Sequence, residues 1–345
     1  MDRISEADVR IEATLYKQQG KVEVYKVFNN KSGQAICMKK IFVEDVMDAT
    51  DIQGELIAMA NLNHPNILSL KSASLGGQNR NITHVLIFMD FFEEGDLEKM
   101  IQTKVRSGIF YTESELLSYI NQIVDACEYM QGKEAAHRDI KPQNIFVCEQ
   151  GKKLKLGDLG SAAKKDAHAG STLIGTPLYL SPKLREVFMA NQNMRVVNHN
   201  MFKSDVYSLG LTFLYMASLK PIKDLCMIIG LEQKIKSRIE ELPNEYSIVK
   251  RILKEMLEVD EYNRPDFIEL KRMLKDFTQV KVPNQQTCKE LKKGEDLKVK
   301  VTTVLQLIGF CEECKRECNE NEIYYIQGHL VCTICFEKFR EFSKE

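Results

Sequence analysis

The sequence predicts an α+β protein of two lobes, a small β-rich lobe followed by a larger helical lobe, with a small cysteine-rich module after them. Three observations support this prediction. The chain of 345 residues is long enough for one large domain and a small appendage. Strand-like patterns dominate up to about residue 93, and helical patterns follow to about residue 278. Five of the ten cysteines lie between 311 and 335.

Two runs of β-forming residues indicate the sheet of the small lobe, which we place at about 10–93. They cover 22–28 and 34–42, and the polar sequence NNKSG between them predicts a turn. A helical stretch over 48–61 follows and carries Glu55. The small lobe is therefore expected to be a sheet with one helix.

The second lobe, about 94–278, follows a hinge that we expect at 85–97. Thr112 and Glu115 form a capping box, which predicts the start of a helix. Two further helices are expected over 204–216 and 266–277. The apolar residues behind the capping box follow a helical spacing and are expected in the core: Leu116, Leu117, Ile120, Ile123, Val124 and Cys127.

The cysteines of the last segment predict a structural zinc site. Cys311 and Cys314 form one CxxC pair, and Cys332 and Cys335 form a second pair after 17 intervening residues. Zn²⁺ prefers four such thiolates in a tetrahedron. A segment as short as 307–345 has too small a core to fold unaided, so metal binding would supply its folding free energy.

Two alternatives to this ligand set stay open. His329 can replace Cys335, because HxxC is also a ligand spacing, and Cys318 is a spare thiol. The sequence EIYYIQGHLV predicts a hairpin between the two pairs. The module resembles a single LIM-type or treble-clef zinc finger, which implies binding of a protein partner. We expect a linker over 279–306.

Composition excludes several classes of function. The net charge is -1, so wholesale attraction to nucleic acid or to an anionic membrane is not expected. No apolar run approaches the roughly 18 residues needed to span a bilayer. We expect a soluble protein in the cytoplasm, with the nucleus as the alternative.

Two short motifs carry the chemistry. They are HRDIKPQN at 137–144 and GDLG at 157–160. Phosphoryl transfer needs a carboxylate at the attacking hydroxyl, a cation on the moving phosphate and oxygen ligands for Mg²⁺, and these motifs contain all three. Their sequence and spacing resemble the eukaryotic protein kinases, and the resemblance covers about three quarters of the chain.

The resemblance implies a role for each residue of these motifs. Asp139 would be the catalytic base, and Lys141 would contact the transferred phosphoryl group. Asn144 and Asp158 would hold Mg²⁺. A lysine two residues after the base implies serine and threonine substrates. The implied fold is the bilobal kinase fold, and the implied cofactors are ATP and Mg²⁺.

The resemblance also assigns residues of the small lobe and the hinge. Lys39, in ICMKK, would hold the α- and β-phosphates, and Glu55 would hold Lys39. Four residues would surround the adenine. Val24 would cover it and Met89 would be the gatekeeper of its pocket. The hinge backbone near Phe91 and Phe92 would form hydrogen bonds with the base.

Three departures from the family pattern matter. The loop expected to cover the phosphates reads YKQQGKVEV at 16–24 and contains only Gly20, although glycine is what permits close approach of backbone to phosphate. Leu159 replaces the usual phenylalanine and keeps an apolar side chain there. Lys183 replaces a glutamate that normally pairs with an arginine, here Arg264, so that repulsion is expected. Glu186 is a candidate replacement partner.

The resemblance implies a protein kinase that phosphorylates serine and threonine hydroxyls of protein substrates. The departures keep a second hypothesis open, a pseudokinase that binds nucleotide and partners without phosphoryl transfer. Asp96 lies where some kinases bind a substrate arginine, but Gln143 replaces a second acidic residue, so substrate preference is not predicted.

Thr172 lies at the usual activating phosphosite of the family, and Asp205 resembles the helix aspartate that braces the catalytic loop. A phosphate on Thr172 would place roughly −1.5 to −2 charges beside Arg138 and order this segment. We therefore expect Thr172→Ala to lower transfer activity. Full activity of that variant, together with no phosphate on Thr172 in active protein by mass spectrometry, would contradict the expectation.

Overall fold

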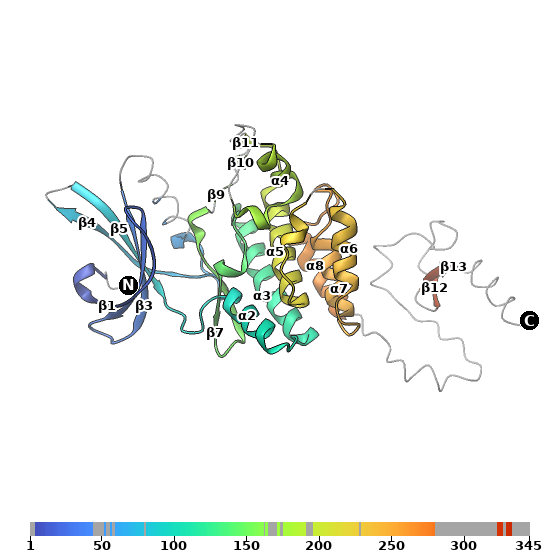
Figure 1. Cartoon of the computed structure of the whole chain (residues 1–345), viewed down its shortest axis with the longest axis horizontal. Helices are drawn as coiled ribbons and strands as arrows, with labels where there is room; N and C mark the ends of the chain where they lie inside the picture. Colours follow the sequence, from blue (N-terminus) through green and yellow to red (C-terminus); the bar gives the residue numbers. More distant parts are fainter. Residues whose placement is uncertain are drawn as a thin grey trace, which may run out of the picture. The chain divides into compact units, whose positions relative to one another are not determined.

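The computed structural model divides the chain into two compact units, Met1–Val280 and Lys281–Glu345 (Figure 1). Structural detail is restricted to residues 4–43, 52, 56, 59–78, 81–161, 163–164, 171–172, 175–190, 196–227, 229–279, 323–326 and 329–332. The first unit contains both predicted lobes.

A five-stranded antiparallel sheet forms the small lobe, with strand order β1-β2-β3-β5-β4. The strands are β1 (Val9–Gln18), β2 (Val22–Asn29), β3 (Ala35–Phe42), β4 (Leu70–Gln78) and β5 (Asn81–Asp90). The strands expected over 22–28 and 34–42 are confirmed as β2 and β3. Gly33 lies in the turn between them with a φ of 67°.

Alternate residues of this sheet face opposite sides. The outer face is a cluster of buried apolar side chains from β2, β3 and β5, namely Val27, Ile36, Met38, Leu86 and Phe88. Ile4 and Val9 pack on this cluster, and the short 3₁₀ helix η1 (Glu6–Asp8) lies between them in sequence. The opposite face, with Val85, Ile87 and Met89, joins the main hydrophobic core.

Two boundaries of the small lobe differ from the prediction. The segment 16–24, which we expected to be a loop, is mostly strand, because β1 pairs with β2 as far as Gln18 and Val22. The hinge is shorter than 85–97, because β5 continues to Asp90 and packs in the sheet. Of the helical stretch expected over 48–61, the described positions Ile52, Leu56 and 59–61 are helical.

Helices dominate the large lobe (Figure 1). They are α2 (Leu97–Ser107), α3 (Glu113–Gly132), α4 (Pro182–Met189), α5 (Met201–Ser218), α6 (Leu231–Glu240), α7 (Ser247–Met256) and α8 (Phe267–Gln279). The capping box before α3 is confirmed, since Glu115 N donates to Thr112 Oγ1 at 3.2 Å and Thr112 N donates to Glu115 Oε2 at 2.7 Å. Of the expected core stripe, only Leu117 is half-buried rather than buried.

The central helix of this lobe is α5. Of its 18 residues 16 are buried, so neighbouring elements surround it on all sides. It packs against α3, α7 and α8. Any polar group on α5 is thus positioned by the core of the lobe.

The segments that connect the long helices of the large lobe contain short strands and 3₁₀ turns. Three two-stranded ladders join β6 (Ala135–Ala136) to β9 (Ala163–Lys164), β7 (Ile145–Cys148) to β8 (Lys153–Leu156), and β10 (Ser171–Thr172) to β11 (Val196–Val197). The 3₁₀ turns are η2 (Pro142–Asn144), η3 (Leu159–Ser161), η4 (Pro177–Tyr179) and η5 (Lys223–Cys226).

The repulsion expected between Lys183 and Arg264 is wrong. Arg264 is 1% exposed and donates to three carbonyl oxygens, of Glu258, Lys203 and Val259. Lys183 Nζ instead lies 3.4 Å from Glu261 Oε1. Each cation has its own partners, so the structure does not require Glu186 to compensate.

In the second unit the structure describes one hairpin. Strands β12 (Ile323–Ile326) and β13 (His329–Cys332) pair antiparallel, with Ile326 opposite His329. The hairpin predicted from EIYYIQGHLV is confirmed. Cys332 is in β13, whereas Cys311, Cys314, Cys318 and Cys335 lie outside the described residues.

Gly210 marks a close contact between α5 and the end of α7. A Cβ at this position would lie 2.9 Å from Leu257 Cδ2 and 3.0 Å from Met256 Cβ. We predict that Gly210→Ala lowers the free energy of unfolding by up to about 2 kcal/mol, since overpacking costs about 1–3 kcal/mol against a helix-propensity gain of about 1 kcal/mol.

The matched control is Gly132→Ala, in the last turn of α3, where a Cβ would meet no atom within 4 Å. Its unfolding free energy should be unchanged or raised by up to about 1 kcal/mol. Denaturant unfolding of both variants tests the comparison. Equal stability of the two would show that the α5 contact is not tight.

Candidate active site

The loop 137–144 is anchored to α5 through Asp205. Its carboxylate accepts hydrogen bonds from the backbone of the loop, from His137 N at 2.7 Å and from Arg138 N at 2.9 Å. Arg138 has a φ of 67°, a left-handed conformation that costs a non-glycine residue about 1–2 kcal/mol. The two hydrogen bonds that Asp205 accepts hold the loop in this conformation, as expected of a bracing aspartate.

His137 joins this loop to the second motif. Its side chain is buried, and burial lowers its pKa, so the imidazole is neutral. Nδ1 accepts a hydrogen bond from Asp139 N at 3.3 Å, which leaves the proton on Nε2, 2.9 Å from the carbonyl oxygen of Gly157. The residue before Asp158 is thereby tied to the loop that carries Asp139.

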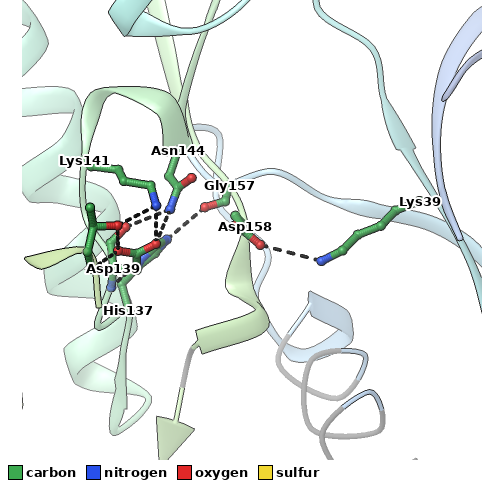
Figure 2. A network of polar contacts seen from close by, with 8 residues as sticks. Lys39, His137, Asp139, Lys141, Asn144, Gly157 and Asp158 are labelled. Atoms are coloured by element: carbon green, nitrogen blue, oxygen red, sulfur yellow. Dashed lines mark hydrogen bonds and ion pairs between the residues drawn. The ribbon is translucent and has the colours of Figure 1, made fainter. Parts of the chain in front are cut away.

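Asp139 is the centre of a polar network (Figure 2). Its Oδ2 accepts from Lys141 Nζ at 2.7 Å, and its Oδ1 accepts from Thr176 Oγ1 at 2.7 Å and Thr176 N at 2.8 Å. Asn144 Nδ2 donates to the backbone oxygen of Asp139 at 2.8 Å and to Oδ2 at 3.1 Å. Lys141 Nζ also donates to Thr176 Oγ1 at 2.7 Å.

These contacts determine the charge of Asp139. Burial by itself would raise the pKa of the carboxyl, but the hydrogen bonds from Lys141 and Thr176 hold the pKa below its ordinary value. Asp139 is therefore an anion near neutral pH, in contact with a cation. A carboxylate in this state can orient a hydroxyl and accept its proton.

Lys39 extends from β3 of the small lobe toward Asp158 (Figure 2). Its Nζ lies 3.6 Å from Asp158 Oδ1. Asp158 has a φ of 55° and a half-exposed side chain, whereas Leu159 beside it is buried in the core. The apolar anchor expected of Leu159 is confirmed, and it fixes the backbone that presents the Asp158 carboxylate.

The donor groups fit MgATP. Asn144 uses its amide nitrogen on Asp139, so its side-chain oxygen is the atom that can ligate a hard cation, as can the Asp158 carboxylate. Lys39 adds a cation on the small-lobe side of Asp158. Oxygen donors beside a lysine suit Mg²⁺ bound to phosphate.

The residues expected near the adenine lie in strands β2 and β5 and directly after β5. Val24 is opposite Lys39 across β2 and β3, so both face the same side of the sheet. Met89 is buried opposite Cys37 at the end of β5. Phe91 and Phe92 follow β5, and Phe92 stacks on Phe146 with 5.5 Å between ring centroids.

Several predicted residues are not assembled into a site. Glu55 lies outside the described residues, so its pairing with Lys39 stays a prediction. Thr172 belongs to β10, opposite Val196, and its phosphorylation stays a prediction. Asp96 caps α2 by accepting from Lys99 N at 2.9 Å, which explains an acidic residue there without a substrate.

The zinc ligands are also untested. Within the residues that the structure describes, no group of three or more His, Cys, Asp or Glu side chains is placed to hold a metal ion. Three of the four expected cysteines lie outside that part of the chain. The zinc site accordingly stays a prediction from sequence.

Sequence reasoning missed Thr176, which contacts both Asp139 and Lys141. Its signal was its place in the motif GTPLYLSP, but nothing local indicated a hydrogen bond to a residue 37 positions earlier.

Among the described helices, none is long and apolar enough to cross a membrane.

Comparison with known proteins matches residues 19–275 to the protein kinase domain family. The chain is 30% identical over 256 residues to probable serine/threonine-protein kinase nek3 of Dictyostelium discoideum, covering 71% of this chain and 22% of that protein. It is 31% identical over 251 residues to mouse serine/threonine-protein kinase Nek4, covering 70% of this chain and 29% of that protein.

The matched part therefore spans less than a third of these relatives. The family match covers most of this chain, however, and includes every residue of the network around Asp139. This chain belongs to the protein kinase family, with serine/threonine kinases among its relatives.

Proposed function

We propose that this protein is a serine/threonine protein kinase that transfers the γ-phosphate of ATP to hydroxyl groups of protein substrates. The observation that supports this most strongly is the network around Asp139, in which one carboxylate contacts Lys141 and Thr176. Lys39 Nζ, which comes from the small lobe, lies 3.6 Å from Asp158 Oδ1. The geometry supplies the charges that phosphoryl transfer needs.

Each side chain has a separate role in this proposal. Asp139 orients the substrate hydroxyl and accepts its proton, and Lys141 stabilises negative charge on the transferred group. Asn144 and Asp158 hold Mg²⁺, which neutralises charge on the phosphates when bound. Lys39 positions the phosphates, and Glu55 is proposed to hold Lys39.

Preference for serine and threonine is supported by Lys141, by the Thr176 contact to it, and by the names of the relatives. The pseudokinase alternative is less favoured. Pseudokinases generally lack at least one residue of the chemistry, whereas Lys39, Glu55, Asp139, Asn144 and Asp158 are all present in this chain.

We also propose that residues 307–345 form a structural zinc finger that binds a protein partner. The two CxxC pairs and the hairpin between them support it. A cytoplasmic location, with the nucleus as the alternative, is likewise proposed, and microscopy of the tagged full chain would test it.

The proposed reaction is tested by Asp139→Asn. Asparagine keeps the size of the side chain but cannot accept the proton, so we predict a loss of transfer of at least about 100-fold. The measurement is Mg²⁺-dependent transfer of labelled γ-phosphate to a generic serine/threonine substrate. The variant should still bind MgADP, because Lys39 and Asp158 are unchanged.

Asp224→Asn is the matched control, since Asp224 is half-exposed, pairs with Arg238 at 2.8 Å and is not part of the polar network around Asp139. It should transfer phosphate at the wild-type rate. Nucleotide binding without transfer by the wild type, including protein phosphorylated on Thr172, would favour the pseudokinase instead.

Metal analysis of the purified chain tests the zinc finger. We predict one zinc per chain, lost on Cys311→Ser and on Cys332→Ser, because a thiolate is removed in each case. Cys318→Ser is the control and should keep the metal. Retention of zinc by Cys335→Ser but not by His329→Ala would assign the fourth ligand to the histidine.

A further inference from the structure

The lid of the proposed nucleotide site is a paired hairpin in this protein. Strand β1 continues to Gln18 opposite Val22, and Lys21 N donates to Gln18 O at 3.0 Å to close the turn. Gly20 lies in this turn with a φ of 73°. Strand pairing therefore extends over the segment in which kinases usually have several glycines.

The two faces of this hairpin have different partners. Val24 shares a face with Lys39, which reaches Asp158, so this face is turned to the proposed nucleotide site. Glu23 is opposite Lys40 in β3 and opposite Lys17 in β1. Neighbouring positions of a strand face opposite sides, so Glu23 and Lys17 lie on the outer face, behind the lid.

Glu23 is unusual because it is a buried carboxylate within this small sheet. Its side chain is 10% exposed, and Lys17 Nζ lies 2.7 Å from Oε1. Tyr25 donates its hydroxyl to Oε2 at 2.5 Å. The hydrogen bonds from Lys17 and Tyr25 lower the pKa of Glu23, and Glu23 in turn raises the pKa of Tyr25 to about 12.

These three side chains, Lys17, Glu23 and Tyr25, form a latch that links the tip of β1 to β2. Tyr25 packs on the outer apolar cluster of the sheet, so the latch is connected to the core of the lobe. A buried carboxylate is tolerated only when it is paired, and a charge-assisted hydrogen bond to a packed tyrosine is geometrically restrictive. The latch therefore stabilises one shape of the hairpin.

We propose that Lys17, Glu23 and Tyr25 are positioning residues that hold the lid hairpin in its nucleotide-binding shape, a role that rests on the proposed kinase function. A glycine-rich lid gains affinity from backbone amides that close around the phosphates. Here side chains occupy most of those positions, so close approach is restricted. A lid that is ordered before the nucleotide arrives avoids the entropy cost of ordering on binding.

The test uses Glu23→Gln, which removes the charge without changing size, and Tyr25→Phe, which removes the hydroxyl but keeps the ring. We expect a dissociation constant for MgADP raised by about 5–10-fold in each and a similarly raised KM for ATP, while kcat at saturating ATP changes by less than about 2-fold, because the lid contributes to binding rather than to chemistry. Amide hydrogen exchange of residues 14–24 should be faster in the nucleotide-free variants.

Glu12→Gln is the matched control. Glu12 is also in β1 and pairs with Lys26 of β2 at 3.2 Å, but its side chain is 40% exposed. This variant should bind MgADP as the wild type does. Unchanged amide exchange in α5 would show that the latch variants keep the fold of the large lobe.

The outcomes separate the latch from the function. If Glu23→Gln and Tyr25→Phe bind MgADP with the wild-type dissociation constant and show wild-type amide exchange, the latch is overturned. The proposed kinase function is not affected by that result. Failure of the wild type to bind nucleotide would overturn the proposed kinase function and this role of the latch together.

Discussion

The catalytic geometry depends on one buried carboxylate, that of Asp205. It is carried by the central helix of the large lobe and accepts hydrogen bonds from the backbone N–H groups of His137 and Arg138. Burial raises the pKa of Asp205 to about 7, and the two amide hydrogen bonds act in the opposite direction. The core of the lobe thereby determines the position of a loop that is itself partly strained, since Arg138 has a left-handed backbone.

From this anchor the contacts continue across the site. The loop positions His137, whose ring is hydrogen-bonded to the carbonyl oxygen of Gly157. Gly157 precedes Asp158, which faces Lys39 of the small lobe. Asp139 is set in the same loop between Lys141 and Thr176. Side chains of a catalytic site must be held within fractions of an ångström, and here core packing and backbone hydrogen bonds provide this rigidity.

Much of this site could be predicted because several of its catalytic residues lie close together in the sequence. Asp139, Lys141 and Asn144 lie in one motif, and the capping box of α3 is equally local. Contacts between distant residues were not predictable in this way. Lys183 with Glu261, and Thr176 with Asp139, join positions 78 and 37 residues apart that meet only in the folded chain.

The lid hairpin also depends on contacts between strands that could not be predicted from the local sequence. A single glycine in YKQQGKVEV suggested a poor phosphate loop, whereas the structure pairs these residues as strands, with an ion pair between the exposed Lys17 and the buried Glu23. Register of that kind is set by cross-strand partners, which a local pattern does not reveal. Glycine content alone is thus a weak guide to the shape of a nucleotide lid.

The most direct measurement is the transfer rate of Asp205→Asn beside its affinity for MgADP. Asparagine would place an amide donor against a backbone donor, and one unsatisfied buried group costs about 1–3 kcal/mol. We expect Asp205→Asn to lower phosphate transfer by more than about 10-fold, with cooperative unfolding and nucleotide binding retained, because each 1.36 kcal/mol of lost transition-state stabilisation is tenfold in rate. Wild-type transfer by Asp205→Asn would contradict the claim that this carboxylate holds the catalytic loop.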